Sequence, residues 1–369
     1  MHTNIKRWAF SVLVVMTSAP SLVLANSLMR GVSKPLFPIS PVIMDARAYE
    51  TYPSVAGHFL VYSRLGHGTF SVIQTSAAEP ATEGRSIVPK QPNEALRFGA
   101  ALRDGAVGYV SNRMGPVSAW MRQARGEGHL LIGNMGTFNG ALVPMNLHAS
   151  PDGRIWCFDT TLEKTQRSRM LSEFADATMD EELLGQTWRF YSSDAFQHKL
   201  GYRATKTGNA SRFQPPSLFV FDRVHGQLTL IPNAFDAAVS PAGKRIVFVR
   251  SINGNYDLWM QDISGGGLTQ LTTTPFGEFE PSWSPDGKKI AFISNRASRG
   301  DVRATSIYVI NLSTGRTTRL TNARTATDGG PAWKDAHTIL FHSNRSPSRP
   351  QTSTVSDWNI WQVNIQGDF

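Results

Sequence analysis

The stretch Glu280-Pro281-Ser282-Trp283-Ser284-Pro285-Asp286-Gly287 decides the fold of this chain, because its second half recurs. Ser-Pro-Asp-Gly also stands at residues 150–153, and an altered copy, Ser-Pro-Ala-Gly, stands at residues 240–243. Aligned on the residue in the Asp position, successive copies lie 42 to 49 residues apart, at Ala56, Asp104, Asp152, Asp194, Ala242, Asp286 and Asp335. Repeats of this length predict an array of β-propeller blades, each a four-stranded sheet.

The residues of the quoted stretch have distinct structural roles. Pro281 has no N–H for a sheet ladder, so we expect it to begin the innermost strand of its blade. We expect Trp283 to pack between neighbouring blades as a core residue. The next three residues favour a tight turn, which Gly287 closes by accepting a positive φ. The same structural motif comprises Pro281, Trp283, Ser284, Pro285, Asp286 and Gly287, with Ser150, Pro151, Asp152 and Gly153 as its second copy.

Seven repeats predict an all-β, seven-bladed β-propeller of four-stranded antiparallel blades, forming one domain over residues 26–369. The expected blades span residues 45–95, 96–135, 140–186, 187–232, 235–275, 279–321 and 330–369. The fourth repeat has lost the Ser-Pro-Asp-Gly phrase, so a six-bladed propeller stays the alternative. Residues 160–186 form an insertion with helix-favouring and acidic residues, either an internal partner for basic loops or a docking site.

The two ends of the domain complement each other. The last repeat ends after its third strand, residues 359–365, whereas residues 34–42 precede the first repeat without a blade of their own. We therefore expect an N-terminal strand to complete the last blade and close the ring, which removes exposed sheet edges.

The first 25 residues have the pattern of a secretory signal peptide. Lys6 and Arg7 precede an apolar run, and Val23 and Ala25 stand where a signal peptidase reads the chain. We expect cleavage and release to the periplasm or the outside of the cell, with a membrane anchor as the alternative and no stable membrane insertion. The single cysteine, Cys157, lies in a strand-like run and excludes an intramolecular disulfide.

The charge of the chain restricts its partners. The formal net charge is +9 and the isoelectric point is about 9.8. Basic exported proteins meet acidic proteins or acidic glycans, so we expect an envelope protein or an acidic polysaccharide as partner. Nucleic acid is not expected, because the sequence has no Lys/Arg run and no recognition helix. We expect a monomer.

The residues from Glu280 to Arg296 resemble the TolB-type propeller repeat. Its signature is an acidic residue, Pro, one further residue and Trp-Ser-Pro-Asp-Gly, followed by an apolar strand that ends in Ser-Asx-Arg. The resemblance is specific in residues 279–321 and good across residues 236–345. It implies a propeller that acts as an exported protein-binding scaffold. The short stretch between the signal peptide and the first repeat leaves no room for the α/β domain that precedes the blades in TolB.

Motifs of catalysis do not stand out in the sequence. No Gly-x-Ser-x-Gly, Walker loop, His-Glu-x-x-His or paired-Cys metal site occurs, and the histidines are scattered singly. We therefore expect a non-catalytic protein without cofactor or metal. The alternative is a propeller-type polysaccharide lyase or hydrolase with its site in the central funnel.

Arginines at one strand end are the candidate binding residues. Ser-Asn-Arg ends the second strand of three repeats, and Ser63-Arg64 is a shorter copy. Because all copies leave the propeller on the same face, they could present a ring of guanidinium groups to an acidic ligand, together with basic loops that follow second strands. The alternative is that each Arg pairs with a carboxylate such as Glu278 or Glu280 of a neighbouring inner strand and fastens blade to blade. The candidates are Arg64, Arg113, Arg296, Arg299, Arg303, Arg345 and Arg349.

Overall fold

The computed structural model describes residues 37–45, 48–66, 69–80, 84–86, 96–111, 118–126, 128–131, 145–160, 217–252, 255–301, 304–322, 326–345 and 358–365. The chain divides into two units, residues 1–34 and 35–369, and all described residues belong to the second. The predicted signal peptide and residues 161–186 of the predicted insertion lie outside the described residues.

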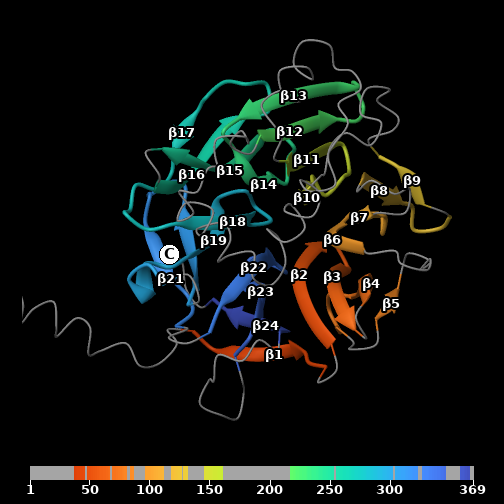
Figure 1. Ribbon diagram of the computed structural model, residues 1–369, viewed down its shortest axis with the longest axis horizontal. Helices are drawn as coiled ribbons and strands as arrows, with labels where there is room; N and C mark the ends of the chain where they lie inside the picture. Colours follow the sequence, from red (N-terminus) through yellow and green to blue (C-terminus); the bar gives the residue numbers. More distant parts are fainter. Residues whose placement is uncertain are drawn as a thin grey trace, which may run out of the picture. The chain divides into compact units, whose positions relative to one another are not determined.

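The described strands form six four-stranded antiparallel sheets, each of which is one blade (Figure 1). Blades 1 to 3 are numbered in chain order, and their strands run from the axis outward. Blade 1 contains β2 (Ala48–Ala56), β3 (Phe59–Gly66), β4 (Thr69–Ser76) and β5 (Arg85–Ser86). Blade 2 contains β6 (Leu96–Ala101), β7 (Val107–Ser111), β8 (Ser118–Arg122) and β9 (Gly128–Leu130). Blade 3 contains β10 (Met145–Ala149), β11 (Ile155–Thr160), β12 (Ser217–Asp222) and β13 (Gln227–Pro232).

The remaining three blades complete the ring. Blade 4 contains β14 (Phe235–Val239), β15 (Arg245–Ile252), β16 (Asn255–Asp262) and β17 (Thr269–Gln270). Blade 5 contains β18 (Glu278–Trp283), β19 (Lys289–Ser294), β20 (Ser306–Asn311) and β21 (Thr317–Arg319), with a single 3-10 turn, η2 (Arg296–Ser298), after β19. Blade 6 contains β22 (Asp328–Trp333), β23 (Thr338–Ser343) and β24 (Asn359–Asn364), with β1 (Ile39–Ile43) as its outer strand.

The prediction of seven blades is wrong, and the six-bladed alternative is correct for the described strands. The expected third and fourth blades are one sheet, since β11 pairs directly with β12 from Ile155↔Asp222 to Thr160↔Ser217. The first two strands of blade 3 come from the predicted third repeat and the last two from the predicted fourth. The segment between β11 and β12 therefore separates two strands of one blade. Its length made the sequence appear to contain an additional repeat.

The outer strand of blade 6 comes from the N-terminal side of the chain. β1 is antiparallel to β24, with Ile39 opposite Val363 and Pro41 opposite Trp361 (Figure 1). The expected terminal strands thus lie side by side. That this pairing holds the ring closed stays a prediction.

The innermost strands begin earlier than expected. β18 starts at Glu278, and Pro281 lies inside it, at a β-bulge between Phe279 and Ser282 where the ladder register shifts. A bulge accommodates a residue that cannot donate to the ladder, so proline is tolerated there. Pro53 and Pro331 occupy the corresponding bulges of β2 and β22.

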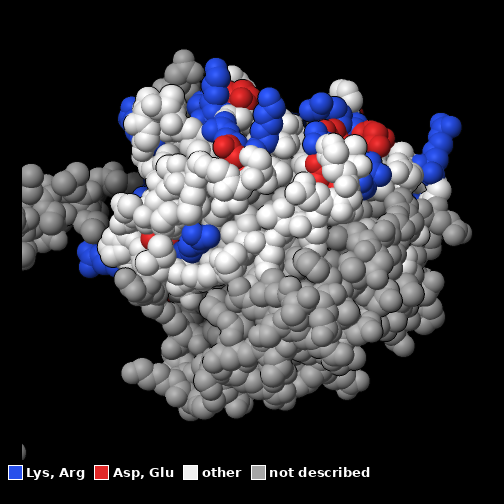
Figure 2. All heavy atoms as spheres, turned by 90° about the horizontal axis from the view of Figure 1, so that it is seen from above, with Lys and Arg blue, Asp and Glu red and all other residues white. Residues whose placement is uncertain are grey.

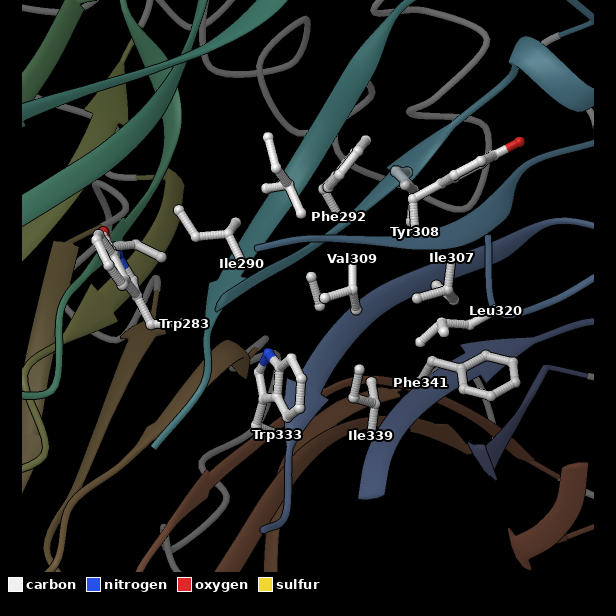
Figure 3. Close-up of a cluster of buried hydrophobic side chains, with 14 of the residues drawn as sticks. Trp283, Ile290, Phe292, Ile307, Tyr308, Val309, Leu320, Trp333, Ile339 and Phe341 are labelled. Carbon is white, nitrogen blue, oxygen red and sulfur yellow. Dashed lines mark hydrogen bonds between the residues drawn. The ribbon is translucent and has the colours of Figure 1, made fainter. Parts of the chain in front are cut away.

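The core lies between neighbouring blades, and Trp283 belongs to it as predicted. Its side chain is 6% exposed, and its indole N–H donates to the carbonyl of Ala238 in blade 4 at 3.0 Å. Trp333 makes the equivalent bond to Ser282 of blade 5 at 3.1 Å, and Figure 3 shows both indoles beside the apolar side chains of blades 5 and 6. Cys157 is fully buried among apolar residues.

Candidate functional site

Every innermost strand carries one residue in the left-handed region at the same place, the β-bulge. A non-glycine residue with positive φ costs of the order of 1–3 kcal/mol, so surrounding contacts must hold it there. Only blade 6 uses glycine. The six residues, which we call the axial ring, and their φ angles are Tyr52 (52°), Phe98 (53°), Asn146 (45°), Asp236 (54°), Glu280 (53°) and Gly330 (54°).

Side chains of one blade hold the axial ring of the next. In five of the six blade junctions of the described residues, the backbone N–H of the ring residue donates to a side chain of the preceding blade. Carboxylate acceptors make such bonds stronger than neutral ones. The five bonds are Tyr52 to His342 Nδ1 (3.1 Å), Phe98 to Ser63 Oγ (3.1 Å), Asp236 to Asp159 Oδ2 (2.6 Å), Glu280 to Asp236 Oδ2 (2.8 Å) and Gly330 to Glu280 Oε2 (2.6 Å).

The six inner strands surround an axial pocket of about 160 Å³. Its wall runs from the axial ring toward the turns that follow the innermost strands, since Pro151 and Pro241 of those turns line it. We call this end of the propeller, with the loops between first and second and between third and fourth strands, the turn end, and the opposite end the loop end. Beyond the axial ring, the wall combines proline and tryptophan with few polar groups: Pro53, Pro281, Pro331, Trp283, Trp333, Ser54, Ser282 and His148.

Two histidines near the axis act as hydrogen-bond acceptors. Burial lowers the pKa of His148, which lines the pocket, to about 4, and its Nδ1 lies 3.3 Å from the N–H of Val239. Burial lowers the pKa of His342 to about 3, and its Nδ1 accepts the N–H of Tyr52. Both imidazoles are therefore neutral at neutral pH, with the proton on the other nitrogen.

Three of the predicted arginines form ion pairs with buried carboxylates. Arg296 lies 2.9 Å from Glu278 and Arg345 lies 2.5 Å from Asp328, and both carboxylates are completely buried. Arg64 contacts Asp45, and it lies 3.7 Å from the buried Glu50, whose pKa burial raises to about 8 against the opposing charge of Arg64.

The alternative hypothesis for these arginines is a bond to a carboxylate of the neighbouring blade. Bonds to carboxylates are observed, but they lie within one blade. Arg296 follows β19 and Glu278 begins β18, which is the adjacent strand of the same sheet. The expected bond from one blade to its neighbour is wrong for Arg296. Glu280, the other carboxylate considered, instead bridges to blade 6 through Gly330.

Of the remaining candidate arginines, Arg299 alone is among the described residues. Arg299 is exposed, with φ of 58°, directly after η2. Arg113, Arg303 and Arg349 lie outside the described residues. The axial pocket is lined by none of the four described candidates, so their role as binding residues stays a prediction.

Sequence reasoning missed the axial ring and the pocket. A signal existed in part, because Asn146, Asp236 and Glu280 each stand six residues before the Asp position of their turn. Tyr52 and Phe98 gave no such signal, since neither residue type favours positive φ.

Neither a metal centre nor a membrane span emerges from the residues that the structure covers. Among them, His, Cys, Asp and Glu side chains do not gather in groups of three or more that could hold a metal ion. Helices of that part of the chain are too short or too polar to cross a membrane.

Comparison with curated proteins finds short matches to TolB. No protein-family model matches the chain. The chain is 30% identical to the Tol-Pal system protein TolB of Alcanivorax borkumensis over 127 residues, which cover 34% of this chain and 26% of that protein. It is 32% identical to the uncharacterized peptidase YuxL of Bacillus subtilis over 101 residues, 26% of this chain and 15% of that protein. The matches thus span about a quarter or less of the length of these relatives.

Solved structures share the fold over most of the chain. The putative TolB from Agrobacterium tumefaciens has a TM-score of 0.51 and 13% identity, and the match covers 89% of this chain and 97% of that one. An oligogalacturonate lyase in complex with manganese also has a TM-score of 0.51, with 10% identity over 90% of this chain and 94% of that one. At these identities the structures establish the propeller fold alone. The chain is thus a β-propeller whose sequence is in part similar to TolB.

Proposed function

We propose that this chain is an exported, non-catalytic scaffold of the cell envelope that binds a partner at the turn end of its axial pocket. The partner is an envelope protein, with an acidic glycan as the alternative ligand. The sequence similarity to TolB and the signal-like first 25 residues support this location and role. The resemblance covers only part of those relatives, so this partner is to be found by experiment and is not taken from them.

The proposal rests on one observation: four ionisable groups near the axis are engaged in structural hydrogen bonds. Asp159, Asp236, Glu280 and His342 each accept a backbone N–H of the next blade. Protonation of His342 Nδ1 would break its bond, and each of the three carboxylates has one oxygen committed to a backbone N–H. The groups therefore serve to hold the ring residues in place, around a pocket whose wall is polar and apolar in nearly equal parts.

We also propose that the pairing of β1 with β24 keeps the ring closed. A blade that lacked its outer strand would expose the unpaired N–H and C=O groups of β24. The rigid scaffold would then depend on the N-terminal strand.

A polysaccharide lyase or hydrolase is the second candidate, and His148 is the observation that favours it. Its imidazole lines the pocket near Asn146 and is neutral at neutral pH. To act as a general base it would have to give up the bond in which its Nδ1 accepts the N–H of Val239. The manganese-bound lyase shows that the same fold can carry an enzyme.

The test is affinity capture from the envelope extract of the source organism with two variants. Ser282→Phe adds an aromatic ring inside the pocket, where Ser282 is half-buried, and Thr273→Phe adds the same ring at an exposed position away from it. The proposal predicts that the parent and Thr273→Phe capture the same partner and that Ser282→Phe loses it while remaining folded. Equal capture by all three would exclude the pocket.

The same proteins decide the enzymatic alternative. Each is incubated with polygalacturonate, with and without manganese, and the ultraviolet absorbance of unsaturated products and the release of reducing ends are followed. The scaffold proposal predicts no turnover. Product formation by the parent that Ser282→Phe abolishes would overturn it in favour of the lyase or hydrolase.

A further inference from the structure

The two ends of the propeller differ in charge. Counted over the described side chains, the turn end has eleven Lys or Arg and seven Asp or Glu, whereas the loop end has six and nine. The cations of the turn end are Arg103, Arg122, Arg125, Arg154, Arg223, Lys244, Arg245, Lys288, Lys289, Arg316 and Lys334, and its anions are Glu79, Asp104, Asp152, Asp222, Asp262, Asp286 and Asp335. The basic residues of the loop end are Arg64, Arg250, Arg296, Arg299, Arg319 and Arg345, and its acidic residues are Asp45, Glu50, Asp159, Asp236, Asp257, Glu278, Glu280, Asp301 and Asp328. Glu50, with its pKa of about 8, is largely uncharged at neutral pH.

The turn motif itself produces this arrangement. Strand pairs of successive blades turn at the same end, and the residues just after the turn glycine are basic in blades 3, 4 and 5: Arg154, Lys244, Arg245, Lys288 and Lys289. Figure 2 shows Lys and Arg side chains projecting in a row along one margin of the described surface, with carboxylates between them.

The carboxylates of the turns face their own backbone. Asp152 accepts the N–H of Arg154 at 3.1 Å, and Asp286 accepts the N–H of Lys288 at 3.0 Å and the hydroxyl of Ser284 at 2.6 Å. Burial opposes ionisation, but the hydroxyl and N–H donors outweigh it and lower the pKa of both carboxyls. These carboxylates stay ionised and exposed, but each is bonded to its own turn, and Lys244, Lys288 and Arg316 are exposed beside them.

Among the described residues, the loop end has more paired arginines than the turn end, where Arg154 lies 2.8 Å from Asp222. Three arginines of the loop end are paired with carboxylates beneath them, as described above for Arg64, Arg296 and Arg345. Their charge is compensated within each blade, which leaves little to attract an anionic partner at a distance.

We infer that the turn end is a docking surface for an acidic segment of a partner protein, which lies across the exposed lysines and arginines around the mouth of the axial pocket. The inference rests on the proposed scaffold function and adds the surface and the chemistry of the partner. An acidic peptide is favoured over an acidic glycan, because the two tryptophans that line the pocket offer no exposed face on which a sugar ring could stack. Trp283 and Trp333 are 6% and 5% exposed, and both indoles are wedged between blades by their N–H bonds.

Two triple variants with equal change of charge test the inference. The turn-end variant carries Lys244→Glu, Lys288→Glu and Arg316→Glu. The loop variant carries Arg299→Glu, Arg303→Glu and Arg349→Glu, the basic loop residues that the sequence alone favours. Binding of a fluorescein-labelled poly-L-glutamate peptide is measured by fluorescence anisotropy over a series of salt concentrations, with polygalacturonate and poly-L-lysine as competitors.

The parent should bind poly-L-glutamate with an affinity that falls as salt is added, and the turn-end variant should weaken binding at least about tenfold because like charges now face each other. The loop variant should stay within about twofold of the parent, because Arg299 follows β19 at the opposite end of the propeller. Equal loss in both variants would mean that only net charge matters, and loss in the loop variant alone would place the surface at the other end. Stronger competition by polygalacturonate than by unlabelled poly-L-glutamate would favour a glycan. Each of these three results would overturn the inference.

The same variants separate this inference from the scaffold function. If the parent and both triple variants capture the same envelope protein equally well, the scaffold function stands and the turn-end surface is wrong. If the parent captures no partner, or captures only proteins that the pocket variant Ser282→Phe also captures, the scaffold function itself fails.

Discussion

His342 joins two blades through one nitrogen atom. It is 6% exposed, its Nδ1 accepts the N–H of Tyr52 in blade 1, and its ring packs against Tyr52 and Trp358 with centroids 4.8 and 5.2 Å apart. Gly329 and Gly330 are required beside it, since a Cβ on either would lie 2.4 or 2.7 Å from the imidazole. Protonation of Nδ1 would remove the acceptor and place a charge in the core.

This arrangement predicts acid sensitivity with a defined sign. The pKa of His342 is lowered from 6.5 to about 3 in the folded protein, so only the unfolded chain takes up its proton as the pH falls below about 6.5. Each such group should reduce the free energy of unfolding by up to about 1.4 kcal/mol per pH unit between pH 6 and 4. Urea unfolding of the parent and His342→Gln at pH 7, 6, 5 and 4 measures the difference. Parallel pH profiles for the two proteins would show that His342 does not contribute.

Arg345 tests whether the Ser-Asn-Arg arginines are structural. Its guanidinium contacts both oxygens of the fully buried Asp328 and stacks over the rings of Phe341 and Trp361. Arg345→Met should cost about 3–5 kcal/mol, because it leaves a buried carboxylate uncompensated. The exposed Arg299→Met should change stability by no more than about 0.5 kcal/mol. Chemical denaturation of both variants provides the measurement, and similar losses in the two would contradict a structural role that is specific to the ion pair.

Among the strands, Trp283 of β18 packs between blades 4 and 5. Trp283→Ala should lower the free energy of unfolding by roughly 3–5 kcal/mol, as for other buried large aromatics. Trp283→Phe retains most of the apolar volume and loses only the indole N–H bond to Ala238, so its cost should be nearer about 1 kcal/mol. Thermal and urea unfolding of both variants check this order. Unchanged stability of Trp283→Ala would show that the side chain is dispensable for packing.

The elements that could be predicted are those with a local signal. Pro285, Asp286 and Gly287 define their hairpin by backbone chemistry alone, and Gly287 has the expected positive φ of 67°. Asp194 misled the repeat count, because a Trp-containing apolar run followed by Asp resembles an inner strand and its turn, whereas the described strands on either side of it, β11 and β12, pair with each other. No local pattern reveals that pairing, since the correct partner of β11 lies more than fifty residues along the chain.

The site was harder to predict for a different physical reason. The axial ring is imposed by contacts between blades, in which Asp159 or Ser63 holds the backbone of a residue far away in sequence. Tyr52 and Phe98 adopt positive φ against their own preference, which is a tertiary effect. The arginines were visible as a repeated triplet, but only the paired carboxylates show that most of their charge is compensated.

For the whole molecule, the pairing of β1 with β24 predicts that the N-terminal strand stabilises the ring. Deleting residues 26–44 from the mature protein should lower its melting temperature and increase aggregation, because β24 becomes an exposed edge strand. Differential scanning calorimetry with light scattering measures both effects. A truncated protein with the parental melting temperature and no added aggregation would refute closure by this strand.

We expect the partner to dock at the turn end, over the axial pocket. Hydrogen–deuterium exchange of the protein alone and with its captured partner measures where it docks. Exchange in the complex should slow in peptides that contain the turns at residues 150–155, 240–245 and 284–289. Protection confined to peptides that contain residues 295–301 and 344–345, at the loop end, would contradict docking at the turn end.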